Sequence, residues 1–156
     1  MSNKLKLYPV EKFSSIREML ALAEKEAPDT YAFKYKPGEK TASGDPVVVS
    51  VTYKEFVNTT RAIGTALYER GVHVACIGEN SYNWVCVYLS TLAGDNVFVP
   101  IDKELPLAEL LNVLQRSGST VVFCTAKFEK IINENKAQLP DIKLIIRTDN
   151  DDFSKL

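Results

Sequence analysis

Residues 74–99, VACIGENSYNWVCVYLSTLAGDNVFV, contain a complete strand–helix–strand pattern. Two short runs, 74–77 and 97–99, are apolar and rich in β-branched residues, and they enclose an apolar helical pattern over 82–93. Strands that are apolar throughout are typical of a sheet covered on both faces. We expect these two strands to lie parallel, because a helical crossover is the usual connection between parallel neighbours.

The same alternation continues downstream. Further helices are predicted at 106–115 and 126–135, and further strands at 120–124 and 143–146. Residues suited to helix ends support these boundaries: Ser81 and Thr125 as N-caps, Pro106 at a first helical position, and Gly94 and Gly118 at helix ends. The sequence therefore predicts an α/β fold with a mostly parallel sheet flanked by helices on both faces.

Upstream of this region, the sequence predicts an N-terminal helix and a β-hairpin. A helical pattern runs over 15–27, and strands at 31–35 and 46–51 flank a polar, turn-rich segment. A capping box, Thr52 with Glu55, then begins another helix, which Gly71 is suited to end. We divide the chain into three parts: 1–52 (helix and hairpin), 53–148 (α/β lobe) and 149–156 (an acidic linker at an expected truncation point).

Composition is that of an ordinary globular domain. Of the 156 residues, 46% are apolar and 25% are charged, and the net charge of −1 favours neither nucleic acid nor an anionic membrane as a partner. Neither a signal peptide nor a transmembrane run is apparent. Cys76, Cys86 and Cys124 are odd in number and widely separated, and no second Cys or His lies at metal-ligand spacing, so neither a disulfide framework nor a zinc site is supported. We expect free buried thiols and a cytoplasmic location.

Two short motifs bear on localisation. Asn58-Thr59-Thr60 fits a glycosylation sequon, but it lies within a predicted helix and no secretory signal precedes it. The terminal Ser154-Lys155-Leu156 has the form of a peroxisomal address, which counts only if Leu156 is the natural end of the protein.

Ligands of parallel α/β sheets gather where the strands end, so chemistry is expected in the turns at 78–81, 100–103 and 124–125. None of these turns contains a complete catalytic set. Glu79 could act as a base, and the amides after Ser81 could meet an anion. The simpler interpretation, that the turn only caps a helix, is favoured.

Other polar or aromatic features have structural explanations. His73, the only histidine, has no metal or nucleophile beside it and is interpreted as a partially packed structural residue. Trp84 and Tyr88 lie one helical turn apart and are interpreted as core. The glycine-containing segment 41–46 lacks a following lysine and is interpreted as a turn, and the acidic segment 149–152 as a solvated linker.

Four segments resemble the opening of the adenylate-forming enzymes. They are VTYKEF (51–56), AIGTAL (62–67), VACIGENSYNW (74–84) and VFVPIDKELP (97–106), and the likeness extends over 13–146. The order and spacing of the segments are similar to those of AMP-forming acyl-CoA synthetases, most closely the long-chain fatty acid branch.

This resemblance implies an enzyme that activates a carboxylic acid with ATP and Mg²⁺ to an acyl-adenylate and then transfers the acyl group to coenzyme A. The family's Ser/Thr-Gly-rich phosphate loop ending in Pro-Lys-Gly, its adenine and ribose motifs, and its C-terminal catalytic lysine have no counterpart in these residues. The turn before Val74 is also shorter than in the family, since only His73 remains of it. No catalytic, cofactor-binding or metal residue is therefore assigned.

Three hypotheses follow. The first is an N-terminal fragment of an acyl-CoA synthetase, a fatty acid ligase that is inactive without the rest of the enzyme as its partner. The second is a naturally short, non-enzymatic interaction module of the same fold. The third, less favoured, is an independent small α/β protein that binds a nucleotide at its strand ends. A lobe separated from its neighbour is expected to expose an apolar face and to be prone to self-association, whereas an independent module is expected to be polar there.

Overall fold

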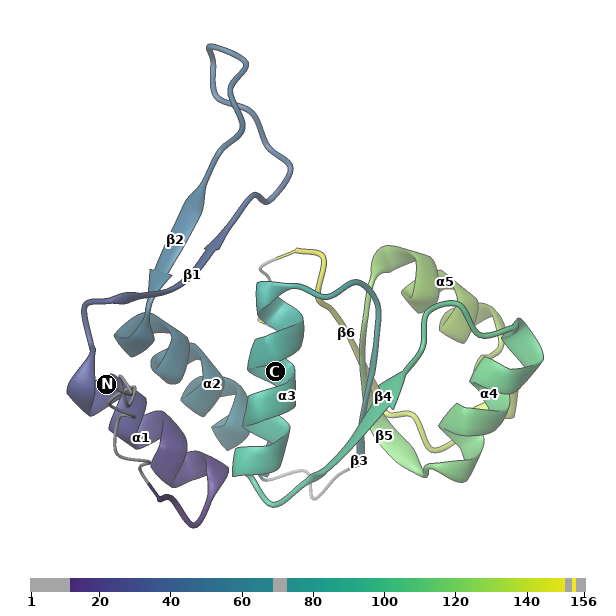
Figure 1. The fold of residues 1–156 in the computed structure, drawn as a ribbon. Helices are drawn as coiled ribbons and strands as arrows, with labels where there is room; N and C mark the ends of the chain where they lie inside the picture. Colours follow the sequence, from purple (N-terminus) through teal and green to yellow (C-terminus); the bar gives the residue numbers. More distant parts are fainter. Residues whose placement is uncertain (1–11, 69–72, 151–152, 154–156) are drawn as a thin grey trace, which may run out of the picture.

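The computed structural model describes residues 12–68, 73–150 and 153 (Figure 1). The helices are α1 (Ile16–Glu26), α2 (Tyr53–Tyr68), α3 (Tyr82–Ala93), α4 (Leu107–Arg116), α5 (Ala126–Glu134) and the 3₁₀ turn η1 (Lys136–Gln138). The strands are β1 (Tyr31–Tyr35), β2 (Val49–Thr52), β3 (His73–Ile77), β4 (Val97–Ile101), β5 (Ser119–Cys124) and β6 (Leu144–Arg147). None of these helices is long and apolar enough to cross a membrane.

The four later strands form one parallel sheet in the order β4-β3-β5-β6. Alternate residues of the central strand β3 point to opposite faces. Val74 and Cys76 belong to a core shared with α1, α2 and α3, while Ala75 and Ile77 belong to a second core beneath α4 and α5. The predicted α/β architecture, a parallel sheet with helices on both faces, is confirmed.

The hairpin of β1 and β2 is antiparallel and extends away from the body of the molecule (Figure 1). Its base is attached to the lobe by aromatic contacts. The ring of Phe33 lies edge-on to Phe56 at 4.9 Å, and the ring of Tyr35 stacks on Tyr82 at 5.5 Å. The predicted second strand, 46–51, begins later than expected, because Pro46 has no amide hydrogen for a ladder and forms only an isolated bridge with Lys40.

The capping box at the start of α2 is present as predicted. The Thr52 hydroxyl accepts a hydrogen bond from the Glu55 amide at 3.2 Å, and the Glu55 carboxylate accepts one from the Thr52 amide at 2.8 Å. Hydrogen bonds from Thr52 to the carboxylate lower the pKa of Glu55, the backbone bond most. The expected end of α2 at Gly71 lies outside the described residues, as do residues 1–11, 151–152 and the terminal Ser154-Lys155-Leu156.

Some predicted helix ends differ in detail. Pro106 is the N-cap of α4 rather than its first helical residue, since its ψ of 148° is extended. Gly94 ends α3 with a φ of −99°, and the left-handed residue is the following Asp95, with a φ of 59°. Gly118, after α4, does take the left-handed conformation, with a φ of 61°.

Candidate functional site at the carboxyl edge of the sheet

The direction of winding changes at the central strand. The chain passes from β3 to β4 on one side, and then crosses back to place β5 on the other side of β3. In parallel α/β sheets ligands bind at such a switch point, outside the carboxyl ends of the strands. The loop after β3 and the turn after β5 therefore form the candidate site.

These two segments are in direct contact at Gly78. Gly78 has a φ of 154°, and a Cβ added there would lie 2.8 Å from the Cγ2 atom of Thr125. Only glycine permits so close an approach with this backbone conformation. The loop after β3 and the turn after β5 are therefore closely packed against each other at the switch point.

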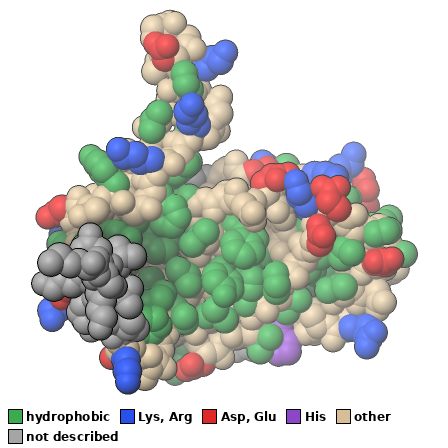
Figure 2. All heavy atoms as spheres, in the orientation of Figure 1, with side chains coloured by type: hydrophobic (Ala, Val, Ile, Leu, Met, Phe, Trp, Pro, Cys, Tyr) green, Lys and Arg blue, Asp and Glu red, His purple; other side chains and the backbone are tan. Residues whose placement is uncertain are grey.

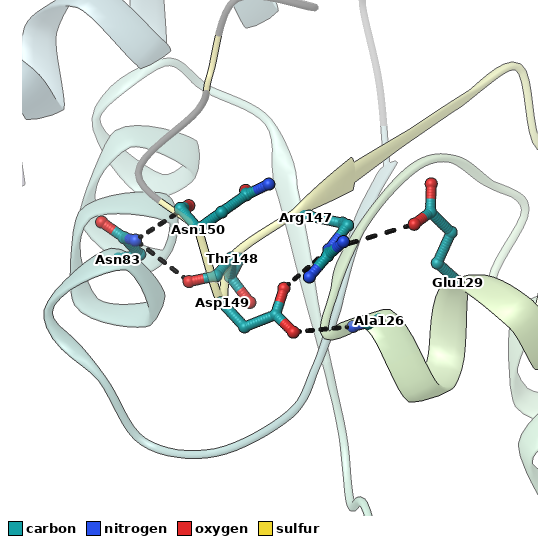
Figure 3. Close-up of polar contacts among 7 residues, drawn as sticks. All are labelled: Asn83, Ala126, Glu129, Arg147, Thr148, Asp149 and Asn150. Carbon is teal, nitrogen blue, oxygen red and sulfur yellow. Dashed lines mark hydrogen bonds and ion pairs between the residues drawn. The ribbon is translucent and has the colours of Figure 1, made fainter. Parts of the chain in front are cut away.

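A polar network continues from this contact across the carboxyl edge (Figure 3). Asn83, in the first turn of α3, is buried, and its side-chain amide donates to the carbonyls of Thr148 at 3.0 Å and Asn150 at 3.5 Å. The segment that follows β6 is thereby attached to the N-terminal end of α3. Sequence analysis did not identify this role, because the partners lie far apart in the chain.

The N-terminus of α5 is occupied by the side chain of Asp149. Its carboxylate accepts a hydrogen bond from the Ala126 amide at 2.9 Å and also pairs with Arg147 at 2.9 Å (Figure 3). Arg147 in turn lies 4.0 Å from Glu129. Thr125 stands at the N-cap position as predicted, but its side chain makes no capping hydrogen bond, so the capping group is Asp149. An external anion at this helix end would have to displace the Asp149 carboxylate.

We expect Asp149→Ala to lower the free energy of unfolding by about 1 kcal/mol at pH 7, the usual value of a helix cap. Arg147 first, and then the Ala126 amide, lower the pKa of Asp149. A carboxyl with a lowered folded pKa stabilises fully above its unfolded pKa of about 4, and this contribution is lost as the pH falls through the folded pKa. Urea unfolding over a pH range of about 2.5 to 7 measures the effect.

Asp149→Asn is the matched control for this prediction, because its amide oxygen can still accept from Ala126 while the charge is removed. We expect a smaller loss at pH 7 than for Asp149→Ala and a shallower dependence of stability on pH below about 4. Equal acid sensitivity of the wild type and both variants would contradict the capping role.

Glu79, the candidate base, is neutralised by Lys103. The Lys103 ammonium donates to both carboxylate oxygens of Glu79, at 2.6 and 2.7 Å, and this contact raises the pKa of Lys103. The pair links the loop after β3 to the loop after β4. The pair is exposed to solvent, and the Glu104 carboxylate lies 3.7 Å from the same ammonium.

The cysteines are buried and unpaired, as the sequence suggested. Burial raises the pKa of Cys76 and Cys124 to about 12 and that of Cys86 to about 11. Because the thiolate is the reactive form, none of them is a nucleophile at neutral pH.

In residues 12–68, 73–150 and 153 no three His, Cys, Asp or Glu side chains come together as a metal site.

The burial of His73, and that of the pair Trp84 and Tyr88, differs in part from the sequence-based interpretation. His73 is an exposed residue, and its ring contacts the lobe through Nδ1, which lies 2.5 Å from the Ser117 carbonyl oxygen. Trp84 and Tyr88 are both half-buried, and Trp84 packs against the core shared by α1, α2 and α3. For the aromatic pair the reason is that α3 faces solvent on one side, and the sequence pattern alone could not say which face of α3 lies on the sheet.

A cavity of about 510 Å³ lies between α1, α2 and α3, at the opposite end of α3 from the candidate site. Its walls are a mixture of small, hydroxyl-bearing and aliphatic side chains together with Arg17 and Arg61. Both guanidinium groups are already engaged: Arg17 donates to the Ala93 carbonyl at 2.7 Å, and Arg61 pairs with Glu24 at 2.8 Å.

The chain thus forms a parallel α/β lobe with a network of polar side chains at the carboxyl edge of its sheet. A family model for the AMP-binding enzymes matches residues 23–156. The chain therefore belongs to the AMP-binding enzyme family and has the fold of the N-terminal part of an adenylate-forming domain.

Similar solved structures include a fatty acyl-CoA synthetase of Mycobacterium tuberculosis. It is 26% identical with a TM-score of 0.67, over 86% of this chain and 26% of that one. The adenylation and carrier didomain of a carboxylic acid reductase from Segniliparus rugosus, in complex with AMP, is 16% identical with a TM-score of 0.74, over 90% of this chain and 22% of that one.

Among curated proteins, the nonribosomal peptide synthetase sirP of Leptosphaeria maculans is 28% identical over 81 residues, which are 50% of this chain and 4% of that protein. The chain thus spans a small part of the curated relative and about a quarter of these two solved structures.

Proposed function

We propose that this chain is the N-terminal portion of an ATP-dependent, AMP-forming acyl-CoA synthetase that activates a fatty acid. The observation that carries the proposal is the match to the AMP-binding enzymes over residues 23–156. The fatty acid branch is supported by the 26% identity to a fatty acyl-CoA synthetase. Buried free thiols are consistent with a reducing cytoplasm, which we include in the proposal.

The reaction we assign to the complete enzyme has two steps. The acid's carboxylate attacks the α-phosphorus of ATP, which forms an acyl-adenylate and releases pyrophosphate. The thiol of coenzyme A then attacks the acyl carbon, which forms the thioester and releases AMP. Adenylation replaces a poor leaving group with a good one, and Mg²⁺ offsets the charge on the phosphates.

The described residues do not fit ATP or Mg²⁺ by themselves. At the carboxyl edge Asp149 occupies the helix end that could hold a phosphate, and Lys103 is paired with Glu79. No metal-binding cluster is present among the described residues. We therefore assign the nucleotide, the metal and coenzyme A to the remainder of the enzyme, and we expect the 156-residue chain alone to be inactive.

The test is ATP–pyrophosphate exchange, measured for the 156-residue chain and for the complete polypeptide encoded by its gene, with a series of fatty acids, anthranilate and amino acids as substrates. We expect exchange only from the complete polypeptide and only with fatty acids. If amino acids rather than fatty acids supported ATP–pyrophosphate exchange, the complete polypeptide would be reassigned to the peptide synthetases. A reading frame that stops at Leu156 would favour the interaction module.

A further inference from the structure

The cavity between α1, α2 and α3 forms because small side chains meet where these three helices pack together (Figure 1). Gly64 brings α2 close to α3, so that a Cβ added there would lie 3.4 Å from the Ser90 carbonyl oxygen. Ala21 of α1 and Ala93 of α3 also line the cavity and leave its volume of about 510 Å³ open. Packed protein rarely leaves spaces larger than a water molecule, whereas ligand pockets commonly have about 300–1,000 Å³. The volume is therefore that of a small-molecule site.

Two arginines bring positive charge to the cavity, and they differ in their partners. Arg61 of α2 pairs with Glu24 at 2.8 Å, which compensates its charge. Arg17 of α1 instead donates a hydrogen bond at 2.7 Å to the neutral carbonyl of Ala93. Within the described part of the chain, no carboxylate lies at ion-pair distance from Arg17. Because a guanidinium has several N–H donors, Arg17 retains both its charge and donors for a ligand.

The rest of the lining is less polar than its residue types suggest. The hydroxyls of Thr65 and Ser90 each donate to the backbone carbonyl four residues earlier in their own helix. Their protons are therefore already used within the protein. Leu20 and Val57 add aliphatic side chains to the walls. A ligand that fits this lining carries hydrogen-bond acceptors for Arg17 and an apolar body for the aliphatic walls.

The charge of the cavity indicates the chemistry of its occupant. Hydrophobic side chains gather over α3 and β4 on the face that Figure 2 shows, whereas the cavity has the Arg17 cation in its wall. A carboxylate matches a guanidinium in charge and in shape, since its oxygens can accept parallel N–H donors. Residues 1–10 of the chain match it less well, because they contain Lys4 and Lys6 and no acidic residue. The complement is therefore an anionic small molecule with an apolar body.

We propose that the cavity between α1, α2 and α3 binds a small aliphatic monocarboxylate, with its carboxylate on Arg17 and its chain along Leu20 and Val57. This ligand site lies at the opposite end of α3 from the carboxyl edge of the sheet. Binding there stabilises the folded lobe by mass action and requires no reacting group. The inference goes beyond the proposed function and does not depend on it, because it rests on the cavity and its charges alone.

The experiment uses the complete polypeptide encoded by the gene and an octanoate probe that carries a photoreactive diazirine in its chain. Peptide mass spectrometry locates the labelled residues, and competition by octanoate, octanol and acetate gives the relative affinities of these compounds. Octanol lacks the charge and acetate lacks the chain, so the two compounds test the two parts of the ligand separately.

Four variants test the contacts. Arg17→Gln keeps an N–H donor for the Ala93 carbonyl but removes the charge, and Arg17→Lys keeps the charge. Ala21→Leu fills the cavity and retains a good helix former. Arg116→Gln is the matched control, because it makes the same charge change at an exposed position at the end of α4. Thermal unfolding verifies that each variant is folded.

We expect the probe to label the parts of α1 and α2 that line the cavity in the wild type. Arg17→Gln and Ala21→Leu should each weaken octanoate binding at least about tenfold, Arg17→Lys should weaken it less, and Arg116→Gln should leave it unchanged. Octanol and acetate should compete at least about tenfold less well than octanoate. If Arg17→Gln does not fold, Ala21→Leu and the comparison of octanoate with octanol decide the question.

Labelling confined to other parts of the polypeptide would overturn the inference. So would equal competition by octanol, or an unchanged affinity for octanoate in a folded Arg17→Gln or Ala21→Leu variant. Labelling of the cavity only after removal of residues 1–11 would also overturn it, and would identify the N-terminal segment of the chain as the occupant. The outcome is independent of ATP–pyrophosphate exchange, so the proposed function can fail while the ligand site stands, and the reverse.

Discussion

Gly78→Ala is expected to lower the free energy of unfolding by about 2–4 kcal/mol. Two effects add at this position. Alanine is strained at a φ of 154°, at a cost of about 1–3 kcal/mol, and its Cβ would lie 2.8 Å from the Cγ2 atom of Thr125. The Thr125 side chain is β-branched and has few accessible rotamers. The steric clash can therefore be relieved only if the turn before α5 moves away from the loop after β3.

Urea denaturation of Gly78→Ala, Thr125→Ser and the double variant separates the two effects. Serine lacks the Cγ2 atom, so the double variant should recover the part of the loss due to the contact but not the part due to backbone strain. Gly64→Ala is the control, because Gly64 lies inside α2 and its added Cβ would be 3.4 Å from the Ser90 carbonyl oxygen. We expect Gly64→Ala to change the free energy of unfolding by less than about 1 kcal/mol. A similarly small effect at Gly78 would contradict the close approach.

Asn83→Ala is expected to lower the free energy of unfolding by about 2–3 kcal/mol. The Asn83 side chain is 6% exposed and donates to two backbone carbonyls of the segment after β6. Its removal leaves the carbonyl of the buried Thr148 without this donor and creates a small cavity. We also expect faster hydrogen exchange at the Thr148 amide, which donates to the Cys124 carbonyl at 2.9 Å.

Asn80→Ala provides a matched control for this prediction, since it deletes the same amide from an exposed position shortly before Asn83 in the chain. We expect its free energy of unfolding to change by no more than about 0.5 kcal/mol. Equal losses for the two variants would show that the burial of Asn83 is not what stabilises the edge.

The Thr52 capping box and the limits of α3 could be predicted because their causes are local. A hydroxyl and a carboxylate three residues apart cap a helix wherever the chain places them. Ser81 likewise accepts from the Trp84 amide at 3.1 Å, as its position before an apolar helix suggested. The contacts of Asn83, of Asp149 with Ala126 and of Lys103 with Glu79 join segments 23 or more residues apart, which is why they were not predicted.

Sequence alone determined the order of strands and helices, the parallel sheet covered on both faces, and the family resemblance. These follow from apolar runs, helical periodicity and helix caps, each set by residues that are close neighbours in the chain. Tertiary structure decided that β3 is central, that Asp149 rather than Thr125 caps α5, and that Trp84 and Tyr88 are only half-buried. Such features depend on which distant segments pack together, and a periodic pattern does not specify them.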